Sequence, residues 1–414
     1  METAQTTLTE QHAIIPQHIC QDGLPTWAGG IDHLSLLRLY FNTVGRFAMS
    51  HRELMSGNEA VAVGAAAAGC SFYTGYPITP QNEITEWFAR ELPKRGGVFL
   101  QSESETGSIQ ILLGAAVTGV RAMTSTASMG WALMQEGISD MVAADLPCVI
   151  ALVQRAGPGG GNIHNAQMDY LSATRGGGHG GYKNIVLAPD SVQECCDLTQ
   201  LAFSLADKYC NPVIVLSDAV IGHMEESLEV KALDFGPVPP KDWALVGKAN
   251  RKDGQRRGLN ISRGSMPEPQ NPNMTYLGHM EMLDRKFKAM AAAEVRYSTY
   301  QAADAKLVLV AYGSSARTCR KAVDLTRAKG LKVGLLRPIT LWPFPSQSIN
   351  EKAKQGAKFL VVEDSLGQLI DDVQMAVEGR AEVYLLGMLA RHIAGPGGFI
   401  FPNRIVAEIE KLYG

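Results

Sequence analysis

Short apolar segments alternate with longer amphipathic or alanine-rich segments along most of the chain after residue 54. The apolar segments predict buried strands, and the longer segments predict helices. Regular alternation of this kind indicates a parallel sheet covered by helices on both faces, that is, a doubly wound α/β domain. The predicted strands of this part are 98–101, 121–126, 148–153, 185–188 and 213–217, and the predicted helices are 58–68, 106–117, 130–143 and 195–205.

Polar residues and proline mark two of the expected helix starts. Thr79 followed by Pro80 fits an N-cap with proline at the first helical position. Ser191 and Glu194 have the spacing of a capping box before the helix 195–205. Both signals agree with the alternation of helices and strands.

The alternation is interrupted by a proline-rich, polar stretch between about 234 and 301, which predicts a linker that ends in a helix at 280–295. A second and smaller α/β unit follows, with strands expected at 307–311, 333–336, 359–362 and 383–386 and a helix at 314–328. We therefore divide the chain into an N-terminal extension (1–51), a first domain (52–233), a linker with a helix (234–304), a second domain (305–390) and a C-terminal tail (391–414).

Charge and composition exclude several classes of partner. The 414 residues include 38 Lys and Arg against 41 Asp and Glu, which gives a formal net charge of −3. This balance gives no basis for binding to nucleic acid or to an anionic membrane surface. The chain has neither a long uninterrupted apolar run nor a signal-peptide pattern at its start, so we expect a cytoplasmic protein.

The cysteines exclude further kinds of site. There are seven, an odd number, and none forms a C-x-x-C pair. Neither a zinc ribbon nor an iron–sulfur ligand run is therefore predicted, and we expect no metal bound by this chain alone. Any iron–sulfur cluster must be bound by another polypeptide.

Three phosphate-binding patterns fail as well. The chain lacks G-x-x-x-x-G-K-[ST], which excludes a P-loop. Gly176, Gly178 and Gly181 satisfy G-x-G-x-x-G. The predicted strand follows these glycines instead of preceding them, however, which argues against a dinucleotide-binding fold. The Gly-Asp-Gly that begins the Mg²⁺–diphosphate motif of thiamine enzymes is also absent.

Two segments before residue 110 are candidates for chemistry. Gly75 to Pro80 forms a turn between predicted elements, where free backbone N–H groups and the Thr79 hydroxyl could meet an anion; a plain N-capped turn is the alternative. Glu105 begins a helix that is otherwise apolar, which suits proton transfer in an apolar interface. Compensation of the helix dipole is the alternative, and by itself the commoner, explanation of a glutamate in the first helical turn.

A third candidate follows the buried strand 148–153. Arg155 stands at the carboxyl end of this strand, where open α/β sheets bind ligands, and its guanidinium suits a two-point contact with a carboxylate. The glycine-rich segment from Gly157 to Gly181 begins two residues later and contains His164 and His179. Each histidine is either a ligand contact or a solvated loop residue.

Several short sequences together resemble the alpha subunit of the 2-oxoacid:ferredoxin oxidoreductases, from about residue 52 to 390. The pairing of Tyr-Pro-Ile-Thr-Pro at 76–80 with Gln-Arg-x-Gly-Pro at 154–158 is the most specific part of this resemblance. The Gly-Asn-Ile at 161–163, the Gly-Gly-Gly-His at 176–179 and the Pro-Ile-Thr-Leu-Trp-Pro-Phe-Pro at 338–345 resemble the branched-chain (2-oxoisovalerate) type, and phenylglyoxylate-type relatives look similar. The other matching stretches are 57–60, 101–107, 124–126, 173–179 and 336–343.

The resemblance implies a pyrimidine-type thiamine diphosphate domain followed by a transketolase C-terminal-like domain. It implies oxidative decarboxylation of a 2-oxoacid with coenzyme A to acyl-CoA and CO₂. Glu105 matches the glutamate that bonds the aminopyrimidine ring, and Thr79 and Arg155 match the contacts of the substrate carboxylate. The turn residues Tyr76, Pro77 and Ile78 would contact the cofactor.

The same resemblance implies partner subunits. Because Gly-Asp-Gly is missing, a beta subunit would bind the diphosphate and its Mg²⁺. Gamma and ferredoxin-like delta subunits with [4Fe-4S] clusters would pass electrons to ferredoxin or another acceptor. A transketolase-like enzyme with its own diphosphate site and a non-catalytic scaffold subunit remain as alternatives.

One departure from the family bears on the substrate. Relatives that act on 2-oxoglutarate resemble Gly-Pro-Ser-Thr-Gly-Leu-Pro-Thr, where this chain has Gly-Pro-Gly-Gly-Gly-Asn-Ile-His at 157–164. Gly159, Gly160 and Ile163 lie in this departure, and two hydroxyls that could anchor a second carboxylate are lost. We therefore expect an apolar or aromatic substrate side chain, with a 2-oxoglutarate or pyruvate enzyme as the alternative.

Overall fold

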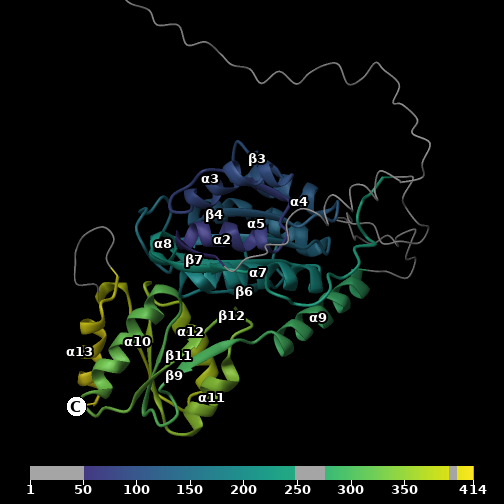
Figure 1. Cartoon of the computed structure of the whole chain (residues 1–414). Coiled ribbons are helices and arrows are strands. Elements are labelled where there is room, and N and C mark those ends of the chain that lie inside the picture. Colours follow the sequence, from purple (N-terminus) through teal and green to yellow (C-terminus); the bar gives the residue numbers. More distant parts are fainter. Residues whose placement is uncertain (1–50, 248–275, 391–398, 414) are drawn as a thin grey trace, which may run out of the picture. The chain divides into compact units, whose positions relative to one another are not determined.

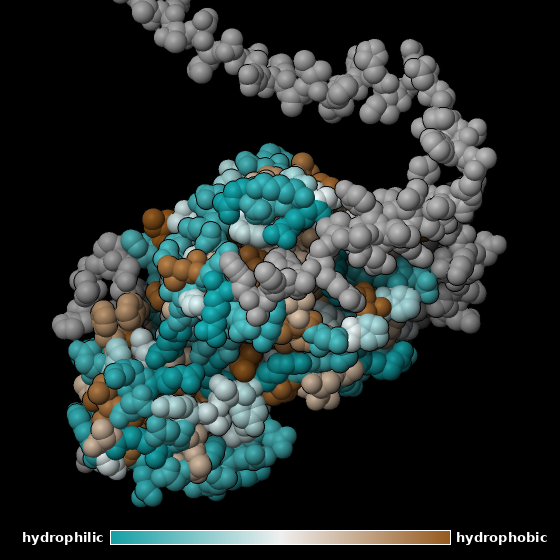
Figure 2. Space-filling model, viewed as in Figure 1, coloured by the Kyte–Doolittle hydropathy of each residue, from teal (hydrophilic) through white to brown (hydrophobic). Residues whose placement is uncertain are grey.

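The computed structural model describes residues 51–247, 276–390 and 399–413. The expected N-terminal extension therefore lies outside the described residues, apart from residue 51. None of the helices formed by the described residues combines the length and the apolar character that a membrane crossing requires. The face of the molecule drawn in Figure 2 is largely hydrophilic, with apolar residues in small groups.

A seven-stranded sheet with the order β12-β6-β7-β5-β4-β2-β3 is the centre of the first domain (Figure 1). All of its strand pairs are parallel except β12–β6. The predicted parallel sheet is confirmed. The strands are β2 (Phe72–Gly75), β3 (Val98–Gln101), β4 (Ala122–Ala127), β5 (Cys148–Gln154), β6 (Ile185–Leu187), β7 (Pro212–Asp218) and β12 (Thr340–Trp342).

Helices cover both faces of this sheet because successive strand residues point to opposite sides. In β5, Ile150 and Leu152 belong to the core beneath α4 and α5. Val149 and Ala151 belong to the opposite core beneath α2, α3 and α7. The helices are α2 (Gly57–Ala67), α3 (Asn82–Glu91), α4 (Glu105–Ala116), α5 (Ser128–Ala143), α6 (Tyr170–Arg175), α7 (Val192–Tyr209) and α8 (Ala219–His223), with a 3₁₀ helix η2 (Pro93–Arg95).

The second domain is a five-stranded sheet with the order β14-β13-β10-β11-β9, in which β9 pairs antiparallel and the others are parallel. In Figure 1, α10 and α13 lie on one side of it and α11 and α12 on the other. Its elements are β9 (Tyr297–Tyr300), β10 (Leu307–Val310), β11 (Val333–Pro338), β13 (Lys358–Val362), β14 (Val383–Leu386), α10 (Gly313–Arg327), α11 (Ser346–Lys354), α12 (Leu369–Val377), α13 (Pro402–Tyr413) and η4 (Met388–Ala390).

Two segments contribute to other units than the expected division suggests. The stretch 234–304, expected as a linker, contains α9 (Tyr276–Ala293) and also β9, which joins the second sheet. Within the expected tail 391–414, residues 391–398 and 414 lie outside the described residues, whereas α13 buries Ile405 and Ile409 in the core of the second sheet. A two-stranded antiparallel sheet of β1 (His51–Ser56) and β8 (Glu225–Val230) joins the two ends of the first domain.

Of the two predicted helix N-caps, one is wrong and the other is confirmed. The N-cap at Thr79 is wrong: the Gln81 N–H donates to the Ile78 carbonyl in a turn, and α3 begins only at Asn82. Ser191 caps α7 as predicted, since its hydroxyl accepts from the Glu194 N–H. The box is incomplete, because the Glu194 carboxylate accepts from the Asp190 N–H and pairs with Arg337.

Candidate functional site

The strands β2, β3, β4 and β5 bring the candidate segments to one edge of the first sheet. The turn 76–80 follows β2, Glu105 follows β3, and Arg155 follows β5. The chain passes from β2 to β3 on one side, whereas β4 lies on the other side of β2. This reversal is the topological switch point at which open α/β sheets bind ligands.

Buried side chains hold the turn 76–80 in place. The Tyr73 hydroxyl lies 2.8 Å from the Thr85 hydroxyl and 2.5 Å from the Ser125 hydroxyl. Ser125 in turn donates to Gln81 Oε1, and Gln81 Nε2 donates to the Tyr76 carbonyl at 3.3 Å. A satisfied buried network of this kind specifies one conformation. The turn is therefore a rigid part of the site.

Arg155 connects this turn to the glycine-rich segment. Its Nη1 donates to the Thr79 carbonyl at 2.9 Å, and its Nη2 donates to the Gly160 carbonyl at 3.3 Å. The side chain is 8% exposed, and within the described residues its Nε has no hydrogen-bond partner. A buried guanidinium with an unused donor is suited to bind a ligand carboxylate.

The segment after Arg155 folds back on itself tightly. Ala156 and Asn162 form an isolated antiparallel bridge, and the Asn162 N–H donates to the Ala156 carbonyl at 2.8 Å. Gly161 has φ +54°, and a Cβ there would lie 1.9 Å from the Ala156 carbonyl oxygen. Only glycine fits this position without strain. The resulting loop keeps Gly160 within reach of Arg155.

Glu105 is the first residue of α4, after the cap Ser104, whose hydroxyl accepts from the Gly107 N–H at 3.0 Å. Its side chain is 6% exposed and lies against the first turn of α5, because a Cβ on Gly130 would be 2.5 Å from Glu105 Cγ. None of the described residues hydrogen-bonds the Glu105 carboxylate. Glu105 and Arg155 thus flank the start of α5, one against Gly130 and the other against Ser128 and Met129.

A cavity of about 690 Å³ opens beside Arg155. Residues of the second domain close one side of it, since Gln368 Nε2 donates to the Met168 carbonyl and the Leu171 N–H donates to Gln368 Oε1. The cavity is mostly apolar, with Arg155 and Asp169 as its charged members. Its lining residues are Ser128, Met129, Ala132, Leu133, Arg155, Gly157, Pro158, Gly159, Gly160, Met168, Asp169, Leu366, Gly367 and Gln368.

Asp169 is a site residue that the sequence analysis missed. Its carboxylate accepts from the Ser128 hydroxyl, and its side chain is 8% exposed. Burial raises the pKa of the Asp169 carboxyl to about 6, against the lowering effects of the Ser128 hydrogen bond and the Arg155 charge. A single aspartate in a loop has no pattern that would single it out in the sequence.

Some of the other predicted site residues line this cavity and others do not. Gly159 and Gly160 line it, as described above. Tyr76 and Pro77 are exposed and Ile78 is half-buried, so the turn presents them at the surface of the sheet edge. Ile163 is 55% exposed and does not line the cavity. His164 is half-buried and His179 is exposed.

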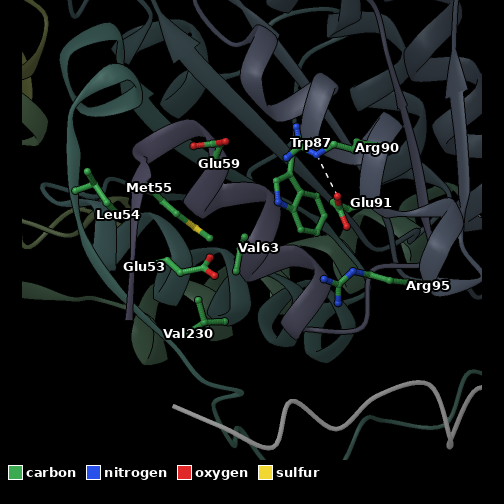
Figure 3. A pocket seen from close by; sticks show the side chains of 10 residues that line it. All are labelled: Glu53, Leu54, Met55, Glu59, Val63, Trp87, Arg90, Glu91, Arg95 and Val230. Carbon is green, nitrogen blue, oxygen red and sulfur yellow. Dashed lines mark hydrogen bonds and ion pairs between the residues drawn. The ribbon is translucent and has the colours of Figure 1, made fainter. Parts of the chain in front are cut away.

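A separate cavity of about 430 Å³ lies between β1, α2 and α3 (Figure 3). Trp87 and Val63 give it an apolar wall. Glu91 pairs there with Arg90, at 3.0 Å, and Arg95 stacks over Trp87. None of the predicted site residues lines this cavity. Across residues 51–247, 276–390 and 399–413, no group of three or more His, Cys, Asp and Glu side chains is placed to hold a metal ion.

The fold and the candidate site together define a doubly wound α/β protein in which a glutamate and an arginine, both largely buried, lie at the carboxyl edge of a parallel sheet. Comparison of the sequence with protein families identifies the family within this class. Residues 63–301 match the thiamine diphosphate-binding domain of pyruvate flavodoxin/ferredoxin oxidoreductase, and residues 305–398 match core domain II of pyruvate:ferredoxin oxidoreductase. The chain belongs to the 2-oxoacid:ferredoxin oxidoreductase family and is a subunit of such an oxidoreductase.

Individual relatives agree with this assignment. The ketoisovalerate oxidoreductase subunit VorB of Methanothermobacter marburgensis is 46% identical over 362 residues, which cover 87% of this chain and 98% of the relative. The 2-oxoglutarate synthase subunit KorA of Methanothermobacter thermautotrophicus is 37% identical over 368 residues, which cover 84% and 97%. The predicted family is therefore confirmed.

A solved structure confirms the predicted fold class. The 2-oxoglutarate:ferredoxin oxidoreductase from Magnetococcus marinus, with 2-oxoglutarate, coenzyme A and succinyl-CoA bound, matches with a TM-score of 0.75 and 29% sequence identity. The match covers 87% of this chain and 65% of that chain. This chain thus corresponds to about two thirds of the longer polypeptide.

Proposed function

We propose that this chain is the alpha subunit of an enzyme that oxidatively decarboxylates a 2-oxoacid with an apolar or aromatic side chain, of the 2-oxoisovalerate or phenylglyoxylate type. Coenzyme A would be the acceptor of the acyl group, as acyl-CoA, with release of CO₂. The observation that supports this most directly is the placement of two groups on the two sides of the α5 start. One is the carboxylate of Glu105, a residue that is 6% exposed, and the other is Arg155 Nε, which is buried without a hydrogen-bond partner among the described residues.

The residues present fit thiamine diphosphate. When bound, this cofactor supplies the carbon nucleophile and electron sink that decarboxylation of a 2-oxoacid needs. Glu105 would hold a proton at its carboxylate toward the aminopyrimidine ring, and the rigid turn Tyr76, Pro77 and Ile78 would contact the cofactor. None of the described residues hydrogen-bonds the Glu105 carboxylate, and such a ring would provide a partner for it.

Arg155 and Thr79 would position the substrate. The Thr79 carbonyl fixes one end of the guanidinium at 2.9 Å, which leaves Nε for the substrate carboxylate. The cavity beside Arg155 would take the substrate side chain. Met129, Leu133 and Leu366 on its wall are apolar, and Gly159 and Gly160 bring no hydroxyl to it. Ile163, next to this wall in the chain, would act on preference indirectly.

Partner subunits would complete the enzyme. The absence of Gly-Asp-Gly from the chain supports a beta subunit that binds the diphosphate and Mg²⁺. The absence of a C-x-x-C pair supports [4Fe-4S] clusters on gamma and ferredoxin-like delta subunits, with ferredoxin or another acceptor beyond them. We place the complex in the cytoplasm.

A second candidate function is supported by two of the relatives. KorA is named a 2-oxoglutarate synthase subunit, and the Magnetococcus marinus enzyme has 2-oxoglutarate bound. A 2-oxoglutarate enzyme would need a cation for the second carboxylate. Arg155 and Asp169 are the charged residues on the cavity wall, and the negative charge of Asp169 disfavours a second carboxylate there.

The test is coenzyme A-dependent acceptor reduction by the purified complex with 2-oxoisovalerate, phenylglyoxylate, pyruvate and 2-oxoglutarate. We expect the first or second to have the highest kcat/KM. Glu105→Gln should lower turnover with every substrate by about 10² or more, because the variant cannot hold the proton. Glu103→Gln, two residues earlier and exposed, is the matched control and should keep wild-type turnover. Wild-type turnover in an assembled Glu105→Gln complex would refute the role of Glu105, and a preference for 2-oxoglutarate would refute the substrate class.

A further inference from the structure

The carboxylate of Asp169 reaches Arg155 through one intervening hydroxyl. Ser128, the first residue of α5, donates its hydroxyl proton to Asp169 Oδ2, and its Oγ accepts the Arg155 backbone N–H at 3.0 Å. The Asp169 backbone N–H donates to Gln154 Oε1 at 3.1 Å, one residue before Arg155. Two contacts therefore tie Asp169 to the end of β5, one through its backbone and one through its side chain.

Only one orientation of the Ser128 hydroxyl supports Arg155 in this way. The hydroxyl has a single proton, and its Oγ also lies 3.3 Å from the Arg155 carbonyl. An ionised Asp169 draws this proton to itself, which leaves an oxygen lone pair for the Arg155 N–H. A protonated Asp169 carboxyl is a weaker acceptor and is itself a donor, so it competes with the Arg155 N–H for the same oxygen.

From this geometry we propose that Asp169 is a positioning residue that, through Ser128, holds Arg155 in place to bind the 2-oxoacid carboxylate. The proposal rests on the proposed function, in which Arg155 contacts that carboxylate. Asp169 also lines the cavity together with Arg155, so that its state of ionisation acts inside the site.

The surroundings of Asp169 define which groups can respond to pH. In the part of the chain that the structure describes, the charged and titratable groups that face its carboxylate are Arg155 at the end of β5 and Tyr312, which precedes α10. Tyr312 stays a neutral phenol because burial raises its pKa well above the usual value. The cavity residues from α5 and from 366–368 are uncharged. Asp169 is thus the group that changes its charge near pH 6, where burial places its pKa.

The sign of the pH effect follows from these contacts. Above pH 6 Asp169 is ionised and Arg155 is held; below it the support is lost. KM for 2-oxoisovalerate in the wild-type complex should therefore rise about fivefold to tenfold between pH 7 and pH 5, the range that loss of one hydrogen bond produces. The value of kcat should change less than twofold, because the contact orients the substrate and takes no part in proton transfer.

Variants of the complete complex test the link. Asp169→Asn keeps an acceptor oxygen for Ser128 but does not titrate, so KM should be nearly independent of pH from 5 to 7. Ser128→Ala breaks the link while Asp169 still titrates, so KM should be raised about fivefold to tenfold and should also lose its pH dependence. Ser128→Thr, which keeps the hydroxyl, should restore the wild-type profile. Asp140→Asn, on α5 and away from the cavity lining, is the matched control and should keep that profile.

Binding of isovalerate, a carboxylate without a reactive 2-oxo group, is measured on the same samples and should follow the same pattern as KM. This arm separates the two proposals: if the wild-type complex turns over none of the four 2-oxoacids, the proposed function fails while binding still tests the role of Asp169. A wild-type pH profile in Asp169→Asn, or a loss in kcat with KM unchanged, would overturn that role.

Discussion

Gly130 in the first turn of α5 sets how close Glu105 can lie, and Gly130→Ala tests this directly. A Cβ at this position would be 2.5 Å from Glu105 Cγ and Oε1 and 2.2 Å from Thr126 Oγ1. Carbon atoms in ordinary contact are about 3.5–4.0 Å apart. The Glu105 side chain must therefore move by roughly 1 Å, a displacement that can lower an enzymatic rate about 10²-fold when it affects a reacting group.

The stability of the variant should fall less than its activity. The clashing atoms belong to the buried side chains of Thr126 and Glu105, and overpacking of a core typically costs about 1–3 kcal/mol. Alanine in a helix is favoured over glycine by roughly 0.5–1 kcal/mol, which offsets part of this cost. We expect kcat/KM to fall about 10²-fold, equivalent to about 2.7 kcal/mol of transition-state stabilisation. Coenzyme A-dependent acceptor reduction measures this, and thermal unfolding of the same complex reports stability.

Gly114→Ala is the matched control. Gly114 lies in α4, the helix that begins with Glu105, and a Cβ there would meet nothing within 4 Å. This variant should keep wild-type activity and gain slightly in stability. A Gly130→Ala complex that assembles and keeps wild-type kcat/KM would show that the position of Glu105 does not limit the reaction.

Three further predictions concern the residues around this centre. Arg155→Lys should lower kcat/KM for all four 2-oxoacids alike, by roughly 1.5–3 kcal/mol, because an ammonium cannot bond the Thr79 and Gly160 carbonyls as the planar guanidinium does and also present a donor to the substrate carboxylate; four unchanged rates would move the carboxylate role elsewhere, with Thr79 the next candidate. Tyr73→Phe removes the hydroxyl shared by Thr85 and Ser125 and should lower the free energy of unfolding by about 1–3 kcal/mol, which denaturant titration measures; an unchanged value would mean that the network contributes nothing. The chain expressed alone should be colourless and should bind thiamine diphosphate weakly in calorimetry; a brown, iron-containing chain would contradict the assignment of the clusters to partners.

Buried parallel strands were the most predictable part of the fold. Such strands are apolar on both faces, so they form short continuous apolar runs in the sequence. The strands predicted at 148–153 and 213–217 differ from the fully buried strands β5 and β7 by at most one residue at each end. The strand predicted at 98–101 also has the bounds of β3, although β3 is a mostly exposed edge strand. In β5 and β7 local composition and tertiary burial give the same result.

β12 could not be predicted, because nothing local separates it from β11. Val333–Pro338 and Thr340–Trp342 follow one another with only Ile339 between them, and most of the residues from 333 to 342 are apolar. The chain leaves the second sheet after Pro338 and joins the first sheet at Thr340, where it pairs with β6. That change of partner depends on contacts with residues some 150 positions earlier in the chain, including Arg337 Nη2 to the Ala188 carbonyl at 2.8 Å.

The candidate site, too, was predictable only in part. Glu105 and Arg155 were found because each follows a predicted strand, and parallel strands share their carboxyl edge. Asp169 was missed because its burial depends on residues that are distant in the sequence. Gln368 of the second domain holds the backbone on both sides of it, through the Met168 carbonyl at 2.7 Å and the Leu171 N–H at 2.9 Å.

The second domain therefore shapes the cavity instead of only adjoining it. The Gln167 N–H donates to the Asp364 carbonyl at 2.7 Å, and the Asp364 N–H donates to Gln167 Oε1 at 3.0 Å, so that one backbone bond and one side-chain bond fix the chain just before Asp169. Glu363 in turn accepts the N–H groups of Gln368 and Leu369 at the start of α12, which keeps Gln368 in place. Because the cavity wall at Met168 and Leu366 is built from segments of both domains, we expect that a change in the second domain can alter the substrate preference of the proposed enzyme without touching the carboxyl edge of the first sheet.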